Sequence, residues 1–586
     1  MPLDWSDPAA GTTHVAFALI RHRDASASQG TIVYNPGGPG LTVIQQADSL
    51  VSTFAPVLDQ HDLLLFDPRG TGLSDPLSCP GFSASQAFAS AAVQAAADGA
   101  CGRSLGAAAA HYGTDAIADD LDALRAALGI GGLNLWGESY GSYLMQVYAA
   151  LFPQHVRSVL LSGPIPIDFP PLGNDQAAAS RQAIDLVCAR SGGACQGPAV
   201  LAAIARLGAQ LERQPVRFTA RLGSQRFPAV LDRAQLASVV YNADNALPEF
   251  GRIPAAVDSA LAGDYAPLEQ LVTETQAAPA FVLGGSPQAS ALVDAAMGRA
   301  TSCHDYPRVF SYADPVAVRV REYQQALRAA NPADFSPFSP LAWSEAGVIG
   351  SGIVGTFDCI DWPDEPTTPS PLPPGARMPD VPTLVLAGDL DTTAPVAFGR
   401  RAAAEFPDSR LVVIPDIGHV PTEGDACALD LGLSFIRTLN IDGGDCAGTG
   451  TAPAVTAPQP LTAAGIPPVP GIAAPAARQA VGLVLAAEAD FANQSAILSL
   501  WGSAPGLRGG TYTAQPDGTF ALDAVRVVND ATIDGTVTLG GSGGGSATLT
   551  LGGTGVENGT LAVTIDVRGH GTATGTLAGA PVDISF

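Results

Sequence analysis

The chain has 586 residues, of which 47% are hydrophobic and 14% charged, so it holds enough apolar material for roughly two or three packed domains. Its formal net charge of −26 argues against a nucleic-acid partner, because a phosphate backbone is bound through patches of Arg and Lys. It contains no apolar run of about 18 residues, so we expect no membrane-spanning helix.

The first 167 residues alternate between strand-like and helix-like segments. Short apolar runs bounded by turn residues predict strands at 14–20, 31–34, 61–67, 133–136 and 156–161. Apolar residues three to four positions apart predict a helix over 115–128, and a second apolar helix follows residue 141. This alternation predicts a parallel sheet covered by helices on both faces.

The pattern becomes mainly helical over residues 168–375, which we interpret as a cap inserted into the α/β domain. The helical segments within it are 199–213, 234–240, 253–262 and 316–330. Strands at 383–387 and 411–414 and a helix at 426–439 then resume the α/β pattern. We therefore expect one α/β domain made of residues 1–167 and 376–447.

The last part of the chain has a different character. Residues 448–477 are rich in Ala, Pro, Gly and Thr and predict a linker. A short helical stretch at 478–500 precedes several alternating polar and apolar runs separated by glycines. Residues 478–586 therefore predict an accessory module with an antiparallel all-β sheet.

Eight cysteines are present, an even number that suggests disulfides and an oxidising compartment. Pairing neighbours in chain order is the simplest arrangement of Cys79, Cys101, Cys188, Cys195, Cys303, Cys359, Cys427 and Cys446. No CxxC pair and no histidine at a zinc spacing occurs, so we expect no metal site and no cofactor. No signal peptide is recognisable at the start of the sequence, so we expect a secreted protein whose leader has been removed.

The segment GESYG (137–141) matches the G-x-S-x-G nucleophile elbow. In that turn the serine lies between a strand and a helix, and glycines flank it because side chains two positions away would collide. The strand LNLW precedes the motif and an apolar helix follows it, which is the context the motif requires. Ser139 is therefore the predicted nucleophile.

The other two triad members must follow the serine in the order acid, then histidine. The strand in PTLVLAGDLDTTAP ends beside two carboxylates, and we favour Asp391 over the competing Asp389 because it lies further past the strand end. The next strand leads into IPDIGHVPTEG, which offers His419 as the general base.

A glycine-rich loop, YNPGGPG (34–40), follows an early strand and can bring a backbone N–H close to a reacting carbonyl group. We predict an oxyanion hole formed by the N–H groups of Gly38 and of Tyr140, the residue after the nucleophile. A second loop, FDPRGTGLSD (66–75), lacks the ending of a phosphate-binding loop, so we expect Arg69 and Asp67 to brace the site.

Taken in order, NPGGPG, DPRGTGLSD, GESYGS, GDLDTTAP and GHVPTEG resemble the secreted tripeptidyl aminopeptidase branch of the proline-iminopeptidase-like serine peptidases. The likeness covers residues 1–447 and extends into the insertion at YNADNALPEF (241–250). It implies an α/β-hydrolase fold with a helical cap, a peptide substrate cleaved near its free N-terminus, and secretion from a bacterium. The β module after residue 478 is not part of the family pattern.

An aminopeptidase must hold a protonated α-amine, which requires a carboxylate near the site. The candidates in the insertion are Asp244, Glu249, Glu269 and Glu274. The motifs alone leave an esterase or another small-molecule acyl hydrolase open as an alternative, because the fold hosts many chemistries. A third possibility is a surface-binding protein in which the β module recognises a surface or partner and hydrolysis is secondary.

Overall fold

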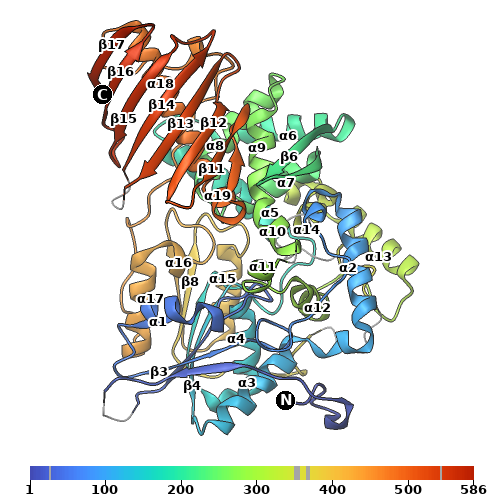
Figure 1. Ribbon diagram of the computed structural model, residues 1–586. Coiled ribbons are helices and arrows are strands. Elements are labelled where there is room, and N and C mark those ends of the chain that lie inside the picture. The colour runs from blue at the N-terminus through green and yellow to red at the C-terminus, as the bar shows by residue number, and fades with distance from the viewer. Residues whose placement is uncertain (25–27, 285, 349–356, 364–369, 541–543) are drawn as a thin grey trace. The chain divides into compact units, whose positions relative to one another are not determined.

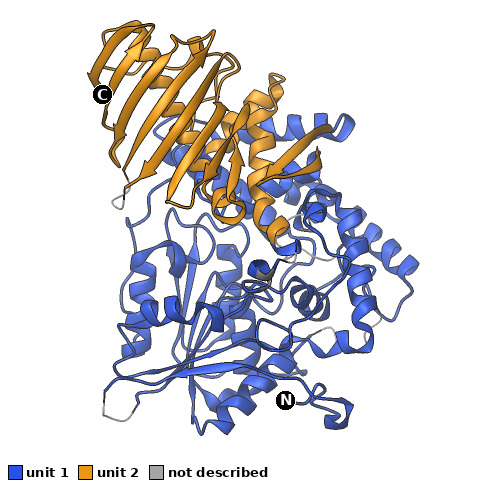
Figure 2. Ribbon diagram, in the orientation of Figure 1, with its two compact units in different colours: residues 1–215, 232–251, 282–455 blue, residues 216–231, 252–281, 456–586 orange. Residues whose placement is uncertain are grey.

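The computed structural model describes residues 1–24, 28–284, 286–348, 357–363, 370–540 and 544–586 (Figure 1). The chain separates into two compact units (Figure 2). Unit 1 comprises residues 1–215, 232–251 and 282–455, and unit 2 comprises residues 216–231, 252–281 and 456–586. Residues 216–231 and 252–281, which the sequence pattern assigns to the insertion, therefore cluster with the C-terminal residues.

Unit 1 is built around a mixed sheet in which seven strands can be followed in the described residues. Their order is β1-β3-β2-β4-β5-β8-β9, and all neighbours are parallel except β1 and β3. The strands are β1 Phe17–Ile20, β2 Thr31–Asn35, β3 Asp62–Phe66, β4 Leu133–Glu138, β5 Val156–Ser162, β8 Thr383–Gly388 and β9 Ser409–Ile414. The predicted α/β-hydrolase fold is confirmed.

Helices cover both faces of this sheet, as the alternation of strands and helices predicts. Successive residues of one strand enter different cores: Val33 packs into one hydrophobic cluster, whereas Ile32 and Tyr34 pack into the other. The first cluster includes α3 (Thr114–Ala127), α4 (Tyr140–Leu151) and α15 (Val396–Glu405), and the second includes α1 (Ala47–Phe54) and α17 (Ala426–Thr438). Each fully buried aliphatic side chain contributes about 1.5–3 kcal/mol to folding, so the two clusters fix the sheet firmly.

The insertion between β5 and β8 supplies further helices to unit 1. They are α5 Asn174–Arg190, α6 Gly197–Arg213, α7 Arg233–Asn242, α12 Ala295–Asp305, α13 Val316–Ala329 and α14 Pro340–Val348. Residues 349–356 and 364–369 of the predicted insertion lie outside the described residues. The cysteines, all of them in described segments of unit 1, pair as neighbours in chain order: Cys79–Cys101, Cys188–Cys195, Cys303–Cys359 and Cys427–Cys446.

Unit 2 contains a hairpin that the helical interpretation of the insertion did not anticipate. Strands β6 (Val216–Leu222) and β7 (Gln225–Leu231) pair antiparallel on either side of Gly223, whose φ of +59° suits a tight turn. Inward and outward side chains alternate along both strands, as in VRFTARL, and this alternation was the available sequence signal. The helices of this unit include α9 (Ala266–Thr275), α18 (Pro475–Asn493) and α19 (Ser495–Trp501).

The C-terminal part of unit 2 is an antiparallel sheet, as the alternating runs predict. In the described residues its strands pair in simple chain order from β10 to β17. They are β10 Ser503–Pro505, β11 Gly509–Ala514, β12 Thr519–Arg526, β13 Ala531–Leu539, β14 Gly545–Gly553, β15 Gly559–Ile565, β16 Gly571–Leu577 and β17 Ala580–Ser585. Among the helices that the structure describes, none combines the length and apolar character of a membrane span.

Candidate active site

Ser139 occupies a strained turn between β4 and α4. Its φ of +51° is unusual for a residue that carries a Cβ, and α4 begins at the next residue. A Cβ at Gly137 would overlap the carbonyl oxygen of Gly141, and a Cβ at Gly141 would overlap that of Asn35. The two glycines of the motif are thus required by close backbone contacts, and the turn presents the serine side chain at the carboxyl end of the sheet.

The structure brings the three predicted triad residues together. His419 Nε2 lies 2.8 Å from Ser139 Oγ, and His419 Nδ1 lies 3.0 Å from Asp391 Oδ2. Asp391 lies in the loop after β8 and His419 in the loop after β9, so neighbouring parallel strands deliver both side chains to one edge of the sheet. The side chain of His419 is only 10% exposed and that of Asp391 is fully buried, which strengthens their electrostatic interaction.

The competing acid, Asp389, points elsewhere. Its Oδ2 accepts a hydrogen bond from Arg190 Nη2 at 2.5 Å, and its Oδ1 accepts one from the backbone N–H of Asp416 at 2.8 Å. Arg190 also pairs with the Asp416 carboxylate at 2.7 Å. Asp389 therefore ties the loop after β8 to the loop after β9 and does not hold His419.

The electrostatic environment favours the protonated form of His419. Burial alone would lower the pKa of His419, but the charge of Asp391 and its hydrogen bond outweigh burial, with further contributions from Asp244 and Glu423. Together they raise its pKa to about 9. An imidazole must be neutral to accept a proton, so this site is suited to alkaline conditions.

Glu138, which precedes the serine, is a site residue that motif reasoning missed. Its carboxylate is buried and accepts hydrogen bonds from Tyr34 Oη at 2.7 Å, Trp136 Nε1 at 2.9 Å and Thr422 Oγ1 at 2.6 Å. Burial, with the charge of Glu423, raises its pKa to about 7. Glu138 thus links the serine turn to the segment just after His419. Only its position inside the motif offered a signal.

The glycine-rich loop lies against the start of α4, where the first backbone N–H groups have no acceptor within the helix. A Cβ on Gly37 would lie 2.8 Å from the backbone nitrogen of Tyr140. The loop can therefore come this close to the start of α4 only because residue 37 is a glycine. The N–H of Gly37 donates to Asn35 Oδ1 at 3.0 Å. Gly38 follows with a φ of +104°. Its N–H and that of Tyr140 are the two predicted donors of the oxyanion hole.

The four amine-site candidates lie in different surroundings. Asp244 and Glu249 belong to unit 1 and are buried. The Asp244 carboxylate already accepts the backbone N–H groups of Thr392 and Thr393. Glu269 and Glu274 belong to unit 2, where Glu274 forms an ion pair with Arg252 and accepts a hydrogen bond from Gln494.

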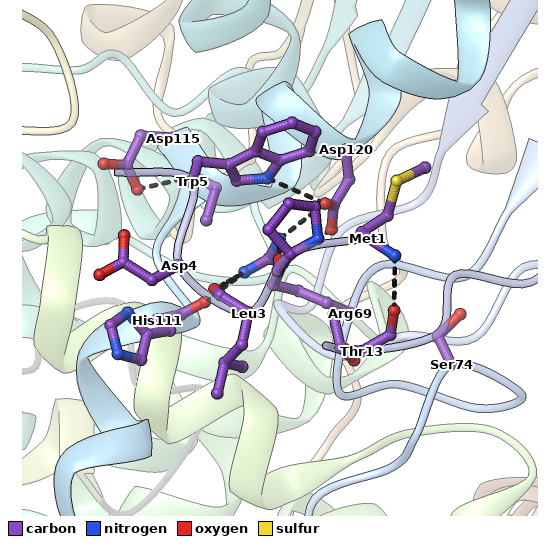
Figure 3. A network of polar contacts seen from close by, with 12 residues as sticks. Met1, Leu3, Asp4, Trp5, Thr13, Arg69, Ser74, His111, Asp115 and Asp120 are labelled. Carbon is purple, nitrogen blue, oxygen red and sulfur yellow. Dashed lines mark hydrogen bonds and ion pairs between the residues drawn. The ribbon is translucent and has the colours of Figure 1, made fainter. Parts of the chain in front are cut away.

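Arg69, in the second glycine-rich loop, forms a buried network beside the N-terminal segment (Figure 3). Its Nε and Nη2 donate to the two oxygens of Asp120 at 2.7 and 2.6 Å, and both side chains are fully buried. Nη1 also donates to the carbonyl oxygens of Leu3 and His111. Arg69 therefore braces the loop against the N-terminal segment.

Comparisons with known proteins match two parts of the chain. Residues 30–185 match the family model described as the α/β hydrolase fold, and residues 347–447 match the model described as TAP-like protein. A tripeptidyl aminopeptidase of Streptomyces coelicolor is 36% identical over 180 residues, which are 28% of this chain and 33% of that protein. The serine protease Hip1 of Mycobacterium tuberculosis is 35% identical over 182 residues, 28% of this chain and 35% of Hip1.

These matches span about a third of the length of the two curated relatives. Among solved structures, the proline iminopeptidase of Mycobacterium smegmatis aligns at 15% identity with a TM-score of 0.31, covering 74% of this chain and 98% of that one. The fold and the family matches define a protein of the α/β-hydrolase superfamily. Residues 347–447 are similar to the TAP-like model, and the two curated relatives are a tripeptidyl aminopeptidase and a serine protease.

Proposed function

We propose that this protein is a serine exopeptidase that releases short peptides, with tripeptides as the expected product, from free N-termini. The observation that carries the proposal is the continuous hydrogen-bonded line from Ser139 through His419 to Asp391. The similarity to a tripeptidyl aminopeptidase supports a peptide substrate. The disulfides suit an oxidising location, so secretion is part of the proposal.

In the proposed mechanism, Ser139 Oγ attacks the scissile carbonyl carbon while His419 Nε2 takes its proton. Asp391 holds the imidazole in the right tautomer and stabilises the imidazolium. The N–H groups of Gly38 and Tyr140 stabilise the negative oxygen. His419 then protonates the leaving amine, and a water molecule that it deprotonates hydrolyses the acyl-enzyme.

The protonated α-amine of the substrate requires a carboxylate near the triad. Asp244 is engaged by two backbone N–H groups beside the triad, whereas Glu249 stands in the first turn of α8 (Pro248–Leu261) within unit 1. All four carboxylates, Asp244, Glu249, Glu269 and Glu274, stay proposed candidates for the amine site. An esterase or other small-molecule acyl hydrolase is the alternative, because the same triad cleaves esters.

The substrate class is tested with a fluorogenic tripeptide amide bearing a free N-terminus, beside its N-acetylated twin and a simple ester. We expect kcat/KM for the free tripeptide to exceed that for the acetylated one at least about tenfold, since a lost charged hydrogen bond costs about 1.5–3 kcal/mol. Equal or faster cleavage of the blocked peptide would exclude the aminopeptidase, and cleavage of the ester without cleavage of either peptide would favour the alternative. The Ser139→Ala variant separates this hydrolysis from contaminating activity.

For the C-terminal module, we infer a binding role. A cavity of about 680 Å³ lies within unit 2, between α18–α19 and the sheet, and its lining includes Phe491, Phe520, Leu549 and Val563. This volume is in the usual range for small-molecule sites. The described lining contains two carboxylates, Glu488 and Asp566, and neither Arg nor Lys, which favours an uncharged apolar ligand over an anionic one.

We expect the neutral fluorescent probe N-phenyl-1-naphthylamine to bind the full-length protein saturably, with about one molecule per chain. Ala547, which lines the cavity and is partly buried, is the site for a filling substitution. Ala547→Trp should weaken binding at least about tenfold, because the indole takes the space of the ligand. The exposed neighbour Thr548→Ala is the control. Unsaturable binding, or binding unchanged by Ala547→Trp, would contradict a ligand site there.

A further inference from the structure

Asp244 lies in the short loop between α7 and α8, more than a hundred residues from either loop that carries Asp391 or His419. Its Oδ2 accepts the backbone N–H groups of Thr392 at 2.9 Å and Thr393 at 2.7 Å. These residues belong to the acid loop, residues 389–395. The side chain of Thr392 also donates to the carbonyl oxygen of Tyr241, so the end of α7 holds the acid loop at several points.

The same residue also holds the histidine loop, residues 415–420. The backbone carbonyl oxygen of Asp244 accepts the N–H of His419 at 3.2 Å. A Cβ on Gly418 would overlap that carbonyl oxygen, so the two segments are in direct backbone contact. One residue therefore contacts both loops, through its carboxylate on one side and its main chain on the other.

The Asp244 carboxylate is also close enough to the triad to act through charge. One oxygen each of Asp244 and Asp391 and one ring nitrogen of His419 lie within 4.8 Å of one another. Asp244 is only 3% exposed, so solvent does little to screen it. The charged or titratable groups that act on it are Asp391 in the acid loop and His419 in the histidine loop, and His419 in turn feels the charge of Glu423 in α16 (Pro421–Gly424). Asn245 Nδ2 donates to its Oδ1 at 2.9 Å.

We propose that Asp244 is a positioning residue of the active site, which holds the acid and histidine loops together and sets the pH at which His419 becomes a base. The proposal rests on the proposed triad. Asp244 need not touch the substrate; it acts through the backbone of Thr392 and Thr393 and through its charge on His419. This role is distinct from the amine binding for which the sequence offers Asp244 as a candidate.

The protonation state of Asp244 decides whether its charge acts on His419. Burial, followed by the charge of Asp391, raises the pKa of Asp244 to about 7. Below that pH Asp244 is neutral, and above it an additional negative charge stands beside His419. That charge favours the imidazolium and raises the pKa of His419. The rate of hydrolysis therefore rises with pH only as His419 loses its proton near pH 9.

Asp244→Asn tests this proposal because it keeps the shape and a hydrogen-bond acceptor but cannot ionise. We expect the ascending limb of the profile of kcat/KM against pH to move down by about one pH unit, since a removed charge at this range is worth at least one unit. Asp244→Ala, which leaves two backbone N–H groups without their acceptor, should lower kcat about 10–100-fold. Circular dichroism and thermal unfolding check that each variant is folded.

Asp232→Asn is the matched control. Asp232 caps the other end of α7, where its carboxylate also accepts two backbone N–H groups, from Ala234 and Gln235. We expect the control to leave the pH profile unchanged, since no hydrogen bond in the described residues joins its carboxylate to a triad residue. A merely structural role for Asp244 would lower kcat in Asp244→Asn without moving the limb, and that result would overturn the proposal.

Asn245→Ala provides a second test should Asp244→Asn not fold. Asn245 is exposed, and its loss removes a hydrogen bond that favours the ionised Asp244. The pKa of Asp244 should then rise from about 7 toward the limb near pH 9, so we expect the lower part of the limb to move in the same direction by a smaller amount. A limb whose lower part keeps the wild-type shape and position would contradict the proposal. If wild type and Ser139→Ala hydrolyse the substrate equally, the proposed triad fails instead, so the two failures are distinguishable.

Discussion

Replacing Ser139 with alanine is expected to lower kcat by roughly 10⁶-fold, because the nucleophile and its base act as a unit. Ser139 Oγ is the atom within 2.8 Å of His419 Nε2, and the strained turn that presents it stays in place when the hydroxyl is removed. The measurement is the steady-state rate on the free tripeptide amide, with circular dichroism to show that the fold is retained. A fluorophosphonate probe should label the wild type and leave the variant unlabelled.

Ser49→Ala is the control for that experiment. Ser49 is an exposed serine on α1 whose hydroxyl donates only to the nearby carbonyl oxygen of Gln46. Its loss should leave the rate and the labelling unchanged. Substantial residual turnover in Ser139→Ala, or labelling of that variant, would mean that another residue is the nucleophile.

Replacing Arg69 with alanine is expected to lower the free energy of unfolding by about 3–5 kcal/mol, because it leaves the charge of Asp120 buried without its partner. Both side chains of the pair are fully buried. The loss also removes the donors that hold the carbonyl oxygens of Leu3 and His111. Urea unfolding followed by circular dichroism and fluorescence measures the change.

Arg23→Ala is the matched comparison, since Arg23 forms an ion pair with Asp59 in which the side chains are 58% and 63% exposed. We expect it to change the free energy of unfolding by no more than about 1 kcal/mol. Equal effects of the two substitutions would mean that the Arg69 network contributes no more than a surface pair does. A large loss for Arg69→Ala alone supports its role as a brace for the loop.

The sequence by itself determined the features that depend on neighbouring residues. Gly137, Ser139 and Gly141 predict the nucleophile turn because the backbone there leaves no room for a Cβ, a requirement visible in five consecutive letters. The strands were predictable because residues such as Ile32 and Val33 face opposite cores. The alternation of these strands with amphipathic helices was sufficient to predict the fold class.

Only the tertiary structure decided which distant groups meet. Asp389 and Asp391 are two residues apart, and the packing of Arg190 against the first leaves the second to hold His419. Asp244 reaches the acid loop across 148 residues of sequence. The grouping of residues 216–231 with the C-terminal sheet is a long-range property too. Steric requirements of a turn and the periodicity of a strand or helix depend on adjacent residues, so a short sequence pattern can predict them. Contacts between distant residues depend on how whole helices and strands pack, and a short pattern cannot predict them.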